Sequence, residues 1–572
     1  MMRKYSLIYM LIALFSFNFI SCDDILDVSP VDSFTDAAVW SDLALVETYL
    51  NTSYSKIVSD VENGAPYSSL SDEVYHMHLY GTDIYRQGRI SMDSYHFGYG
   101  NDKWSPWGYY YGAIKEVNLF LERVPEIETT SEREEKWKNE LIGQGHFLRA
   151  YFYYMLYVHF GKVPIIENTY GLETESFDEV RASIEEVGNF VVAECDKSIA
   201  LLPVSYDADN FGRATKGAAL ALKARTLLFS ASPLCGTPSA EKWQKASDAN
   251  KAVIDLKDDN GNPVYSLRNV ESSEEYSKLF YDKTNPEIIF LKMFDSKWVV
   301  GSNGSFLHQV PCGGGRGFGE GWGTLQPTQE IVDRFQKKDG SFDIMPNEEI
   351  DYSPWADRDI RFDATIFVDD SYWGIGEDYR RVEFFISEDS KVVSHGRDSK
   401  SGPSYWNATK TGYLIKKFLD PNYDPTGTTA NTTPWIFMRL AEFYLNYAEC
   451  QIQLGNNAEA LDYINKTRER VNMPKLTGSD IWAEYENERQ VELVFEGQRW
   501  FDQRRWQTLE YTYNNVPVTG IEIVKHIDGT KTYKRLANPI ETRVFNAPRQ
   551  YWIPVPRYEV RRAPQLDGWP YE

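Results

Sequence analysis

The sequence predicts a mainly α-helical fold of irregular tetratricopeptide-like helical hairpins, which carry a loop-rich, partly β variable insertion. Apolar residues recur three and four positions apart near both ends of the chain, as they do along one face of a helix. Residues 436–474 have the spacing of a tetratricopeptide helical pair. Residues 256–434 differ, because glycine clusters and turn sequences such as Asn260-Gly261-Asn262-Pro263 interrupt them.

Two long helices are expected in the first third of the chain, at Trp107–Val124 and at residues 134–160. The first carries a stripe of residues at helical spacing, namely Tyr111, Ile114, Asn118 and Leu121. The second has a broad apolar face and ends at Gly161 and Pro164, since both residue types stop helices.

Two further segments are expected to form helical hairpins. Thr215–Ser230 is rich in alanine and glycine, which let two helices approach closely, and Trp243–Asp255 is its expected partner. The other hairpin consists of Arg439–Leu454, a turn at Gly455-Asn456-Asn457 and a return helix at Ala458–Arg470. A strict period of about 34 residues is absent, so we expect irregular repeats. An ordinary helical hairpin is the alternative interpretation.

The N-terminus has the organisation of a lipoprotein signal peptide. Arg3 and Lys4 precede a largely apolar run and a small residue, after which stands Cys22. We interpret Phe19-Ile20-Ser21-Cys22 as a lipobox, so that residues 1–21 are removed and Cys22 becomes the lipidated first residue. An ordinary signal peptide beside an unrelated cysteine is the alternative. Cleavage removes two basic and no acidic residues, so the net charge of −24 becomes −26.

This acidity argues against nucleic acid as a partner, because phosphate binding needs basic patches. No second apolar run approaches the length that spans a bilayer, so the lipid is the expected membrane attachment. The remaining cysteines are widely spaced without a CxxC pair. We expect them to be buried thiols; one disulfide could form, but none is required. These cysteines are Cys195, Cys235, Cys312 and Cys450.

Signatures of catalysis are scarce. The zinc-protease, nucleophile-elbow and P-loop patterns are absent, and no two carboxylates stand out as a glycosidase pair. The glycine-rich residues 312–323 fit a flexible loop. His76 and His78 could share one face of a strand, but no third metal ligand is suitably spaced. No cofactor is predicted. Binding of a structural calcium ion is left as an alternative, although no loop has the EF-hand spacing.

The densest charged segment is residues 484–506. On one helix Glu488, Glu492 and Glu496 would lie four residues apart, with Arg489 and Arg499 close by. A catalytic interpretation would make Glu492 or Glu496 an acid or base. We favour a buried ion-pair lattice, because arginine side chains satisfy carboxylates in this arrangement.

Segments from one end of the chain to the other together resemble the SusD/RagB family. They are Cys22–Pro30, Trp107–Glu122, Gly145–Pro164, Arg213–Pro233, Pro327–Gly340, Arg439–Pro474, Glu488–Trp506 and Tyr551–Pro564. The resemblance implies about four irregular tetratricopeptide-like hairpins that support a variable region. It also implies a non-enzymatic surface lipoprotein that binds a glycan and acts as the lid of a SusC-like TonB-dependent transporter in the outer membrane.

Further expectations follow from this resemblance. Asp23-Asp24 resembles the signal that sends such lipoproteins of Bacteroidota to the exterior face of the outer membrane. The mature chain, residues 22–572, is expected to be one compact unit. It would comprise an N-terminal helical part (22–255), a ligand-binding variable region (256–434) and a C-terminal helical part (435–572). Because some relatives import peptides, a peptide-import lid of the RagB type is an alternative, and a surface glycoside hydrolase is a more distant one.

The resemblance also directs the search for ligand-binding residues to loops near residues 65–105 and to the variable region. Flat rings stack on the C–H faces of sugars, and polar side chains bind the hydroxyls. The candidates are Asp72, Tyr75, Tyr80, Tyr85, Trp104, Trp298, Arg316, Trp322 and Trp373. Each has a structural alternative: Trp104 and Trp322, for example, could belong to the core.

Overall fold

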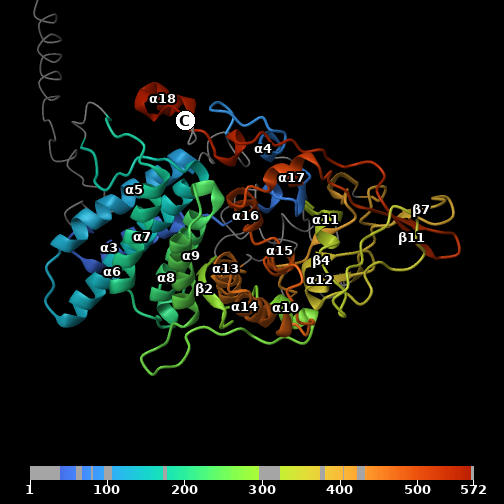
Figure 1. The fold of residues 1–572 in the computed structure, drawn as a ribbon, viewed down its shortest axis with the longest axis horizontal. Coiled ribbons are helices and arrows are strands. Elements are labelled where there is room, and N and C mark those ends of the chain that lie inside the picture. The colour runs from blue at the N-terminus through green and yellow to red at the C-terminus, as the bar shows by residue number, and fades with distance from the viewer. Residues whose placement is uncertain are drawn as a thin grey trace, which may run out of the picture.

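The computed structural model confirms a mainly α-helical protein with a partly β insertion (Figure 1). It describes residues 39–59, 67–78, 81–95, 106–171, 177–294, 323–373, 380–403, 405–421 and 432–568. The predicted signal peptide and several predicted site residues lie outside these ranges, namely Cys22, Tyr80, Trp104, Trp298, Arg316 and Trp322.

Long helices pack side by side in one stack. Its order is α5 (Pro106–Arg123), α6 (Glu132–Phe160), α7 (Ile184–Leu201), α8 (Lys216–Ala231), α9 (Ala240–Ile254), α13 (Leu440–Gln453), α14 (Asn457–Glu469) and α15 (Ile481–Glu492). Both predicted hairpins are therefore confirmed, as α8–α9 and α13–α14. Because α9 packs against α13, the two halves of the stack join across the insertion, which Figure 1 shows beside them.

Local signals explain the helix boundaries. The Ser131 hydroxyl accepts a hydrogen bond from the backbone N–H of Glu134 and begins α6, whereas Gly161, at φ 70°, ends it. At the start of α7, Ser183 and Glu186 form a reciprocal capping box. These side chains satisfy N–H groups that a helix end leaves without partners. The observed α6 agrees closely with the helix that the sequence predicts at residues 134–160.

The other α-helices of the described ranges lie outside this order. They are α3 (Leu43–Ser55), α4 (Thr82–Arg86), α10 (Ser273–Lys278), α11 (Gln329–Val332), α12 (Ile360–Thr365), α16 (Arg499–Arg505), α17 (Leu509–Asn514) and α18 (Arg557–Arg562).

The described strands form small sheets. Antiparallel pairs are β1 (Val74–His76) with β3 (Leu325–Pro327), β2 (Ile288–Lys292) with β9 (Trp435–Arg439), β4 (Ile366–Phe367) with β8 (Leu414–Ile415), and β5 (Tyr372–Trp373) with β6 (Arg380–Arg381). One sheet has three strands, in which β10 (Ile521–Lys525) is central. It pairs antiparallel with β11 (Lys531–Arg535) and parallel with β7 (Ile386–Ser387). Strands of the insertion thus pair with strands of the C-terminal part.

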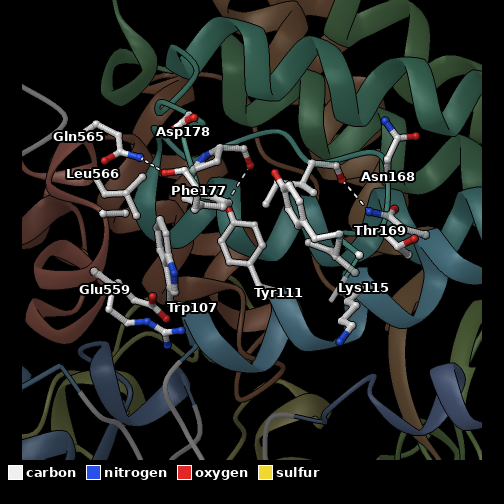
Figure 2. A pocket seen from close by; sticks show the side chains of 18 of the residues that line it. Trp107, Tyr111, Lys115, Asn168, Thr169, Phe177, Asp178, Glu559, Gln565 and Leu566 are labelled. Atoms are coloured by element: carbon white, nitrogen blue, oxygen red, sulfur yellow. Dashed lines mark hydrogen bonds between the residues drawn. The ribbon is translucent and has the colours of Figure 1, made fainter. Parts of the chain in front are cut away.

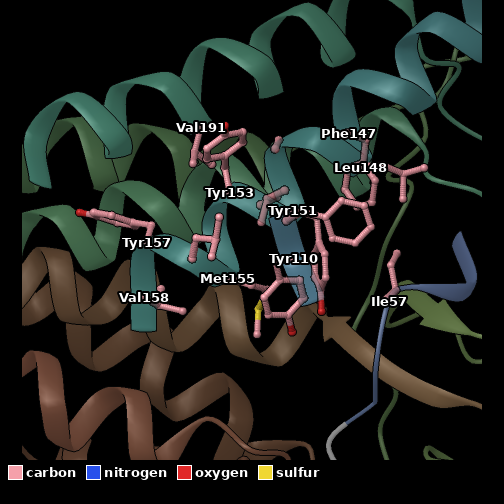
Figure 3. Packing of buried hydrophobic residues seen from close by; sticks show 14 of the residues in the cluster. Ile57, Tyr110, Phe147, Leu148, Tyr151, Tyr153, Met155, Tyr157, Val158 and Val191 are labelled. Carbon is pink, nitrogen blue, oxygen red and sulfur yellow. The ribbon is translucent and has the colours of Figure 1, made fainter. Parts of the chain in front are cut away.

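The largest hydrophobic core lies between the helices of the stack (Figure 3). Tyr110, Phe147, Leu148 and Tyr151 pack together there with little or no exposed surface. Tyrosines in this core also form hydrogen bonds, since the Tyr153 hydroxyl donates to the carbonyl of Ile166 over 3.0 Å. A second core combines residues of the insertion, such as Phe362, with residues that follow it, such as Val494. Aromatic residues make up 15% of the chain, and part of them therefore serves packing.

Glycines allow the closest helix approaches. At Gly145 of α6 an added Cβ would come within 2.8 Å of Phe120 on α5, whereas at Gly112 of α5 nothing lies within 4 Å. We expect Gly112→Ala to raise the free energy of unfolding by about 0.5–1 kcal/mol. Gly145→Ala gains the same helix propensity but overpacks the crossing, so it should be about 1–3 kcal/mol less stable than Gly112→Ala. Chemical denaturation measures both variants, and equal effects would contradict the close crossing.

The charged segment at residues 484–506 forms a buried ion-pair lattice, as predicted. Glu492 accepts hydrogen bonds from Arg361 over 2.9 Å and from Arg439 over 2.6 Å, and it also contacts Arg470. The prediction that one helix carries Glu488, Glu492 and Glu496 was wrong, however. Helix α15 ends at Glu492, and the chain turns through Phe495 at φ 63°, so Glu496 lies beyond the helix. Its carboxylate nevertheless joins the lattice through Arg439 and Lys417, at 2.7 Å from each.

Within the described ranges, no helix is both long and apolar enough to cross a membrane. In the same part of the chain, no group of three or more histidine, cysteine or acidic side chains is arranged to hold a metal ion. Cys195 and Cys450 are buried, Cys235 is partly buried, and none of the three is in a disulfide. Cys312 lies outside the described residues.

Candidate ligand-binding site

The structure joins the two regions in which the sequence predicts ligand-binding loops. Strand β1 pairs with β3, placing Tyr75 opposite Gln326. The pairing extends one step further, where the backbone N–H of Met77 donates to the carbonyl of Thr324 over 2.9 Å. Tyr80 and Trp322 follow and precede this end of the ribbon in sequence, within three residues of it. The described ribbon therefore joins Tyr75, from the first predicted region, to β3, from the second.

Tyr75 lies on this ribbon with 7% of its surface exposed. The Lys410 ammonium donates to its hydroxyl over 3.2 Å and lies 5.5 Å from the ring centroid. The Arg86 guanidinium is 6.0 Å from the same ring. The Lys410 ammonium is thus positioned beside the ribbon by a hydrogen bond and a cation–π contact with Tyr75.

Asp72 anchors the segment that leads into the ribbon. Its carboxylate accepts two hydrogen bonds from Arg499, at 3.0 and 2.9 Å, and its backbone carbonyl accepts one from Thr328 over 2.8 Å. Burial acts to raise the pKa of Asp72, but the Arg499 guanidinium outweighs it and the pKa is lowered. Asp72 is therefore held as a carboxylate in a structural ion pair.

Two other candidates lie in the core. Trp373 is 7% exposed, and its ring packs edge-on against Phe367 at a centroid distance of 5.3 Å. Tyr85 is buried beside Trp500, and its hydroxyl donates to the carbonyl of Gln550 over 3.0 Å. The structure thus places both rings among other side chains rather than on an open surface.

Sequence reasoning missed the most exposed aromatic pair in the described part of the insertion. Tyr405 and Trp406 lie on a short 3-10 turn, Tyr405–Asn407, just before Lys410. A signal was present, because two aromatic residues follow the turn-forming Gly402-Pro403 and no apolar periodicity surrounds them.

A pocket of about 770 Å³ lies between α5 and the C-terminal segment (Figure 2). Three residues of the stripe that predicts α5 line it, namely Tyr111, Ile114 and Asn118, and Trp107 forms part of the same wall. Opposite them stand Phe177 and the C-terminal residues Gln565 and Leu566. The volume is in the range of small-molecule sites.

Hydrogen bonds hold the wall of this pocket in place. The Tyr111 hydroxyl donates to the carbonyl of Pro164 over 2.8 Å, and burial raises the pKa of this tyrosine well above its usual range. The backbone N–H of Thr169 donates to Glu122 over 2.6 Å, and Gln565 donates to the carbonyl of Phe177 over 2.5 Å.

The lining residues combine aromatic rings with polar and charged groups. Lys115, Asn168, Asp178 and Glu559 contribute amide, ammonium and carboxylate groups, and no histidine, cysteine or serine is among the described residues that line the pocket. Such a lining is suited to non-covalent binding of a polar ligand that has apolar faces.

Comparison with known families decides the relationship. A model described as the SusD family matches residues 286–571. The chain belongs to the SusD family. A second model of related proteins, described as "Starch-binding associating with outer membrane", matches residues 91–228. The two matches together include helices α5–α7, most of α8, the insertion from residue 286 and the buried lattice.

Individual SusD-like proteins resemble this chain along most of its length. Two are from Formosa agariphila: SusD-like protein P38 is 22% identical over 84% of this chain and 87% of its own, and SusD-like protein P2 is 23% identical over 99% of both. A crystal structure of a SusD-like protein from Bacteroides fragilis is 28% identical with a TM-score of 0.77, covering 94% of this chain and 99% of its own. A second Bacteroides fragilis structure, titled a SusD-like carbohydrate binding protein, is 22% identical with a TM-score of 0.72, covering 92% of this chain and 99% of its own.

Proposed function

We propose that this protein is a cell-surface lipoprotein that captures an oligo- or polysaccharide and delivers it to a SusC-like TonB-dependent transporter, for which it acts as a lid. The observation that carries this proposal is the match of the SusD family model to residues 286–571. Related proteins are described as starch-binding proteins associated with the outer membrane or as carbohydrate binding proteins, which supports the proposal.

The geometry of the described residues supports a binding protein more than an enzyme. The acidic segment at residues 484–506 would be the strongest catalytic candidate, but Glu492 is fully buried and neutralised by arginines. The pocket between α5 and the C-terminal segment and the β1–β3 ribbon both combine aromatic rings with polar groups. This combination binds sugars without requiring a nucleophile.

Affinity electrophoresis tests glycan binding. The mature protein without Cys22 migrates through native gels that contain amylopectin, arabinoxylan, laminarin, yeast α-mannan, pectic galactan or mucin glycans, and reducing ends are assayed in parallel. We expect one polymer to retard the protein without new reducing ends.

The other outcomes separate the alternatives. New reducing ends would indicate a surface glycoside hydrolase. If no polymer retards the protein, the glycan-capture proposal fails, and binding of a peptide library would then support a peptide-import lid of the RagB type.

Membrane attachment depends on Cys22 in this proposal. We expect Cys22→Ala to abolish incorporation of a palmitate analogue into the protein and to release it from the outer-membrane fraction, because the acyl chains on this residue are the only predicted anchor. Cys235→Ala is the matched control and should retain both label and membrane association. Unchanged labelling of Cys22→Ala would contradict the lipobox.

A further inference from the structure

The turn at Tyr405–Asn407 presents two aromatic rings to solvent. Tyr405 is 66% exposed and Trp406 is 60% exposed, and their ring centroids are 5.6 Å apart at an interplanar angle of 78°. Exposing a tryptophan to this extent forgoes most of the free energy that its burial would contribute. Packing in the folded chain therefore does not account for these side chains, and their pairing distinguishes them from a singly exposed ring such as Tyr511.

The backbone on the N-terminal side of this turn is held firmly. The N–H of Gly402 donates to the carbonyl of Ser399 over 2.9 Å, and a Cβ on Gly402 would come within 2.4 Å of the carbonyl oxygen of Gly396. The segment that precedes the aromatic pair therefore packs directly on neighbouring backbone, where only glycine fits.

The C-terminal side of the turn is equally constrained. The Thr409 hydroxyl donates to the carbonyl of Tyr413 over 2.7 Å and accepts the N–H of Gly412 over 3.1 Å. Thr409 itself is buried. The backbone is thus anchored at Gly402 and at Thr409, and this limits the backbone entropy that the two rings between them lose when a ligand binds.

The turn also leads directly to the ribbon that joins the predicted ligand-binding segments. One residue after Thr409, the backbone N–H of Lys410 donates to the Gln326 side chain of β3 over 2.7 Å. The Lys410 ammonium donates to Tyr75 of β1 over 3.2 Å. The aromatic pair therefore stands within five residues of a lysine that contacts both strands of the ribbon.

We propose that Tyr405 and Trp406 form a carbohydrate-stacking subsite that continues the β1–β3 ribbon. Two rings nearly at right angles offer flat faces to the C–H surfaces of sugar rings, and the exposed Lys410 ammonium supplies donors for hydroxyl groups. Two rings on a turn bounded by the polar Ser401 and Lys410 are too small an apolar area for a stable protein interface. The proposal rests on the proposed glycan-binding function and deepens it.

The test uses the mature protein and the polysaccharide that retards it in the gels. We expect Trp406→Ala to weaken binding about tenfold, as for the loss of a stacked ring together with its buried area. Trp406→Phe should keep most of the affinity, because it retains a flat ring. The matched control is Tyr511→Ala, which removes a 65% exposed tyrosine on α17 and should leave the affinity unchanged.

The outcomes distinguish this subsite from the proposed function. If the wild-type protein binds a polysaccharide and Trp406→Ala binds it equally well with an unchanged melting temperature, the subsite is refuted and glycan binding stands. Tyr405→Ala provides a second, independent variant should Trp406→Ala fold poorly. If the wild-type protein binds no polysaccharide in the panel, both the function and the subsite are overturned.

Discussion

Replacing Glu492 with glutamine is expected to lower the free energy of unfolding by about 3–5 kcal/mol, because it removes a counter-charge that several buried arginines share. Arg361 and Arg439 donate to this carboxylate over 2.9 and 2.6 Å, and all three side chains are at most 1% exposed. Burial acts to raise the pKa of Glu492, but the surrounding guanidinium groups, with Arg470 the strongest, hold it far below its usual range.

Chemical and thermal denaturation of Glu492→Gln measure this effect. The matched control is Glu469→Gln on the neighbouring helix α14, where Glu469 is 46% exposed and pairs with Lys475 at 2.5 Å. An exposed pair of this kind contributes about 0–1 kcal/mol, so the control should unfold almost like the wild type. Similar losses for both variants would refute the lattice as a source of stability. Because the protein is large, agreement between spectroscopic probes should be checked before a free energy is assigned.

The second large effect is a loss of stability on mild acidification, which we expect to depend on His159. This imidazole is fully buried beside Tyr67 and Trp500, and its Nδ1 is 2.6 Å from the carbonyl oxygen of Met155. Burial, and to a smaller extent the nearby Arg504 guanidinium, lower the pKa of His159 to about 3. The folded protein therefore keeps this histidine neutral at pH values where an unfolded chain protonates it.

The direction of the pH dependence follows from proton binding. Between pH 6.5, the ordinary pKa of histidine, and about 3, the unfolded state binds one more proton at His159 than the folded state does. This residue's contribution to stability is complete above pH 6.5 and is lost as the pH falls through that window. The expected loss between pH 7.5 and pH 5 is about 2 kcal/mol, at about 1.4 kcal/mol for each pH unit below 6.5.

The variant His159→Asn isolates this contribution, because asparagine keeps a hydrogen-bond donor without the titration. Its free energy of unfolding should change between pH 7.5 and pH 5 by about 2 kcal/mol less than that of the wild type. Other titrating groups act in both proteins and cancel in this comparison. Identical pH slopes would show that His159 is protonated in the folded protein or accessible to water.

Most helices of the stack could be predicted from the sequence because their signals are local. Apolar residues at helical spacing lie on one face of α5 and α6, and Gly161 ends α6 at the predicted position. Turn and cap residues act within a few positions of the helix end that they define. The break between α15 and α16 could not be predicted from local signals. Phe495 adopts a positive φ there, while Glu492 and Glu496 on either side of it bind Arg439 from another element.

By itself, the sequence determined the helical architecture, the family and the buried charge lattice. Only the tertiary structure decided which aromatic side chains are covered. Trp373 and Trp406 are both tryptophans in the loop-rich insertion, yet Trp373 packs on Phe367 and Trp406 stands in solvent. The pairing of β1 with β3 is equally non-local, since its partners lie about 250 residues apart. Exposure and strand pairing depend on neighbours that are distant in the chain, and local residue patterns do not encode them.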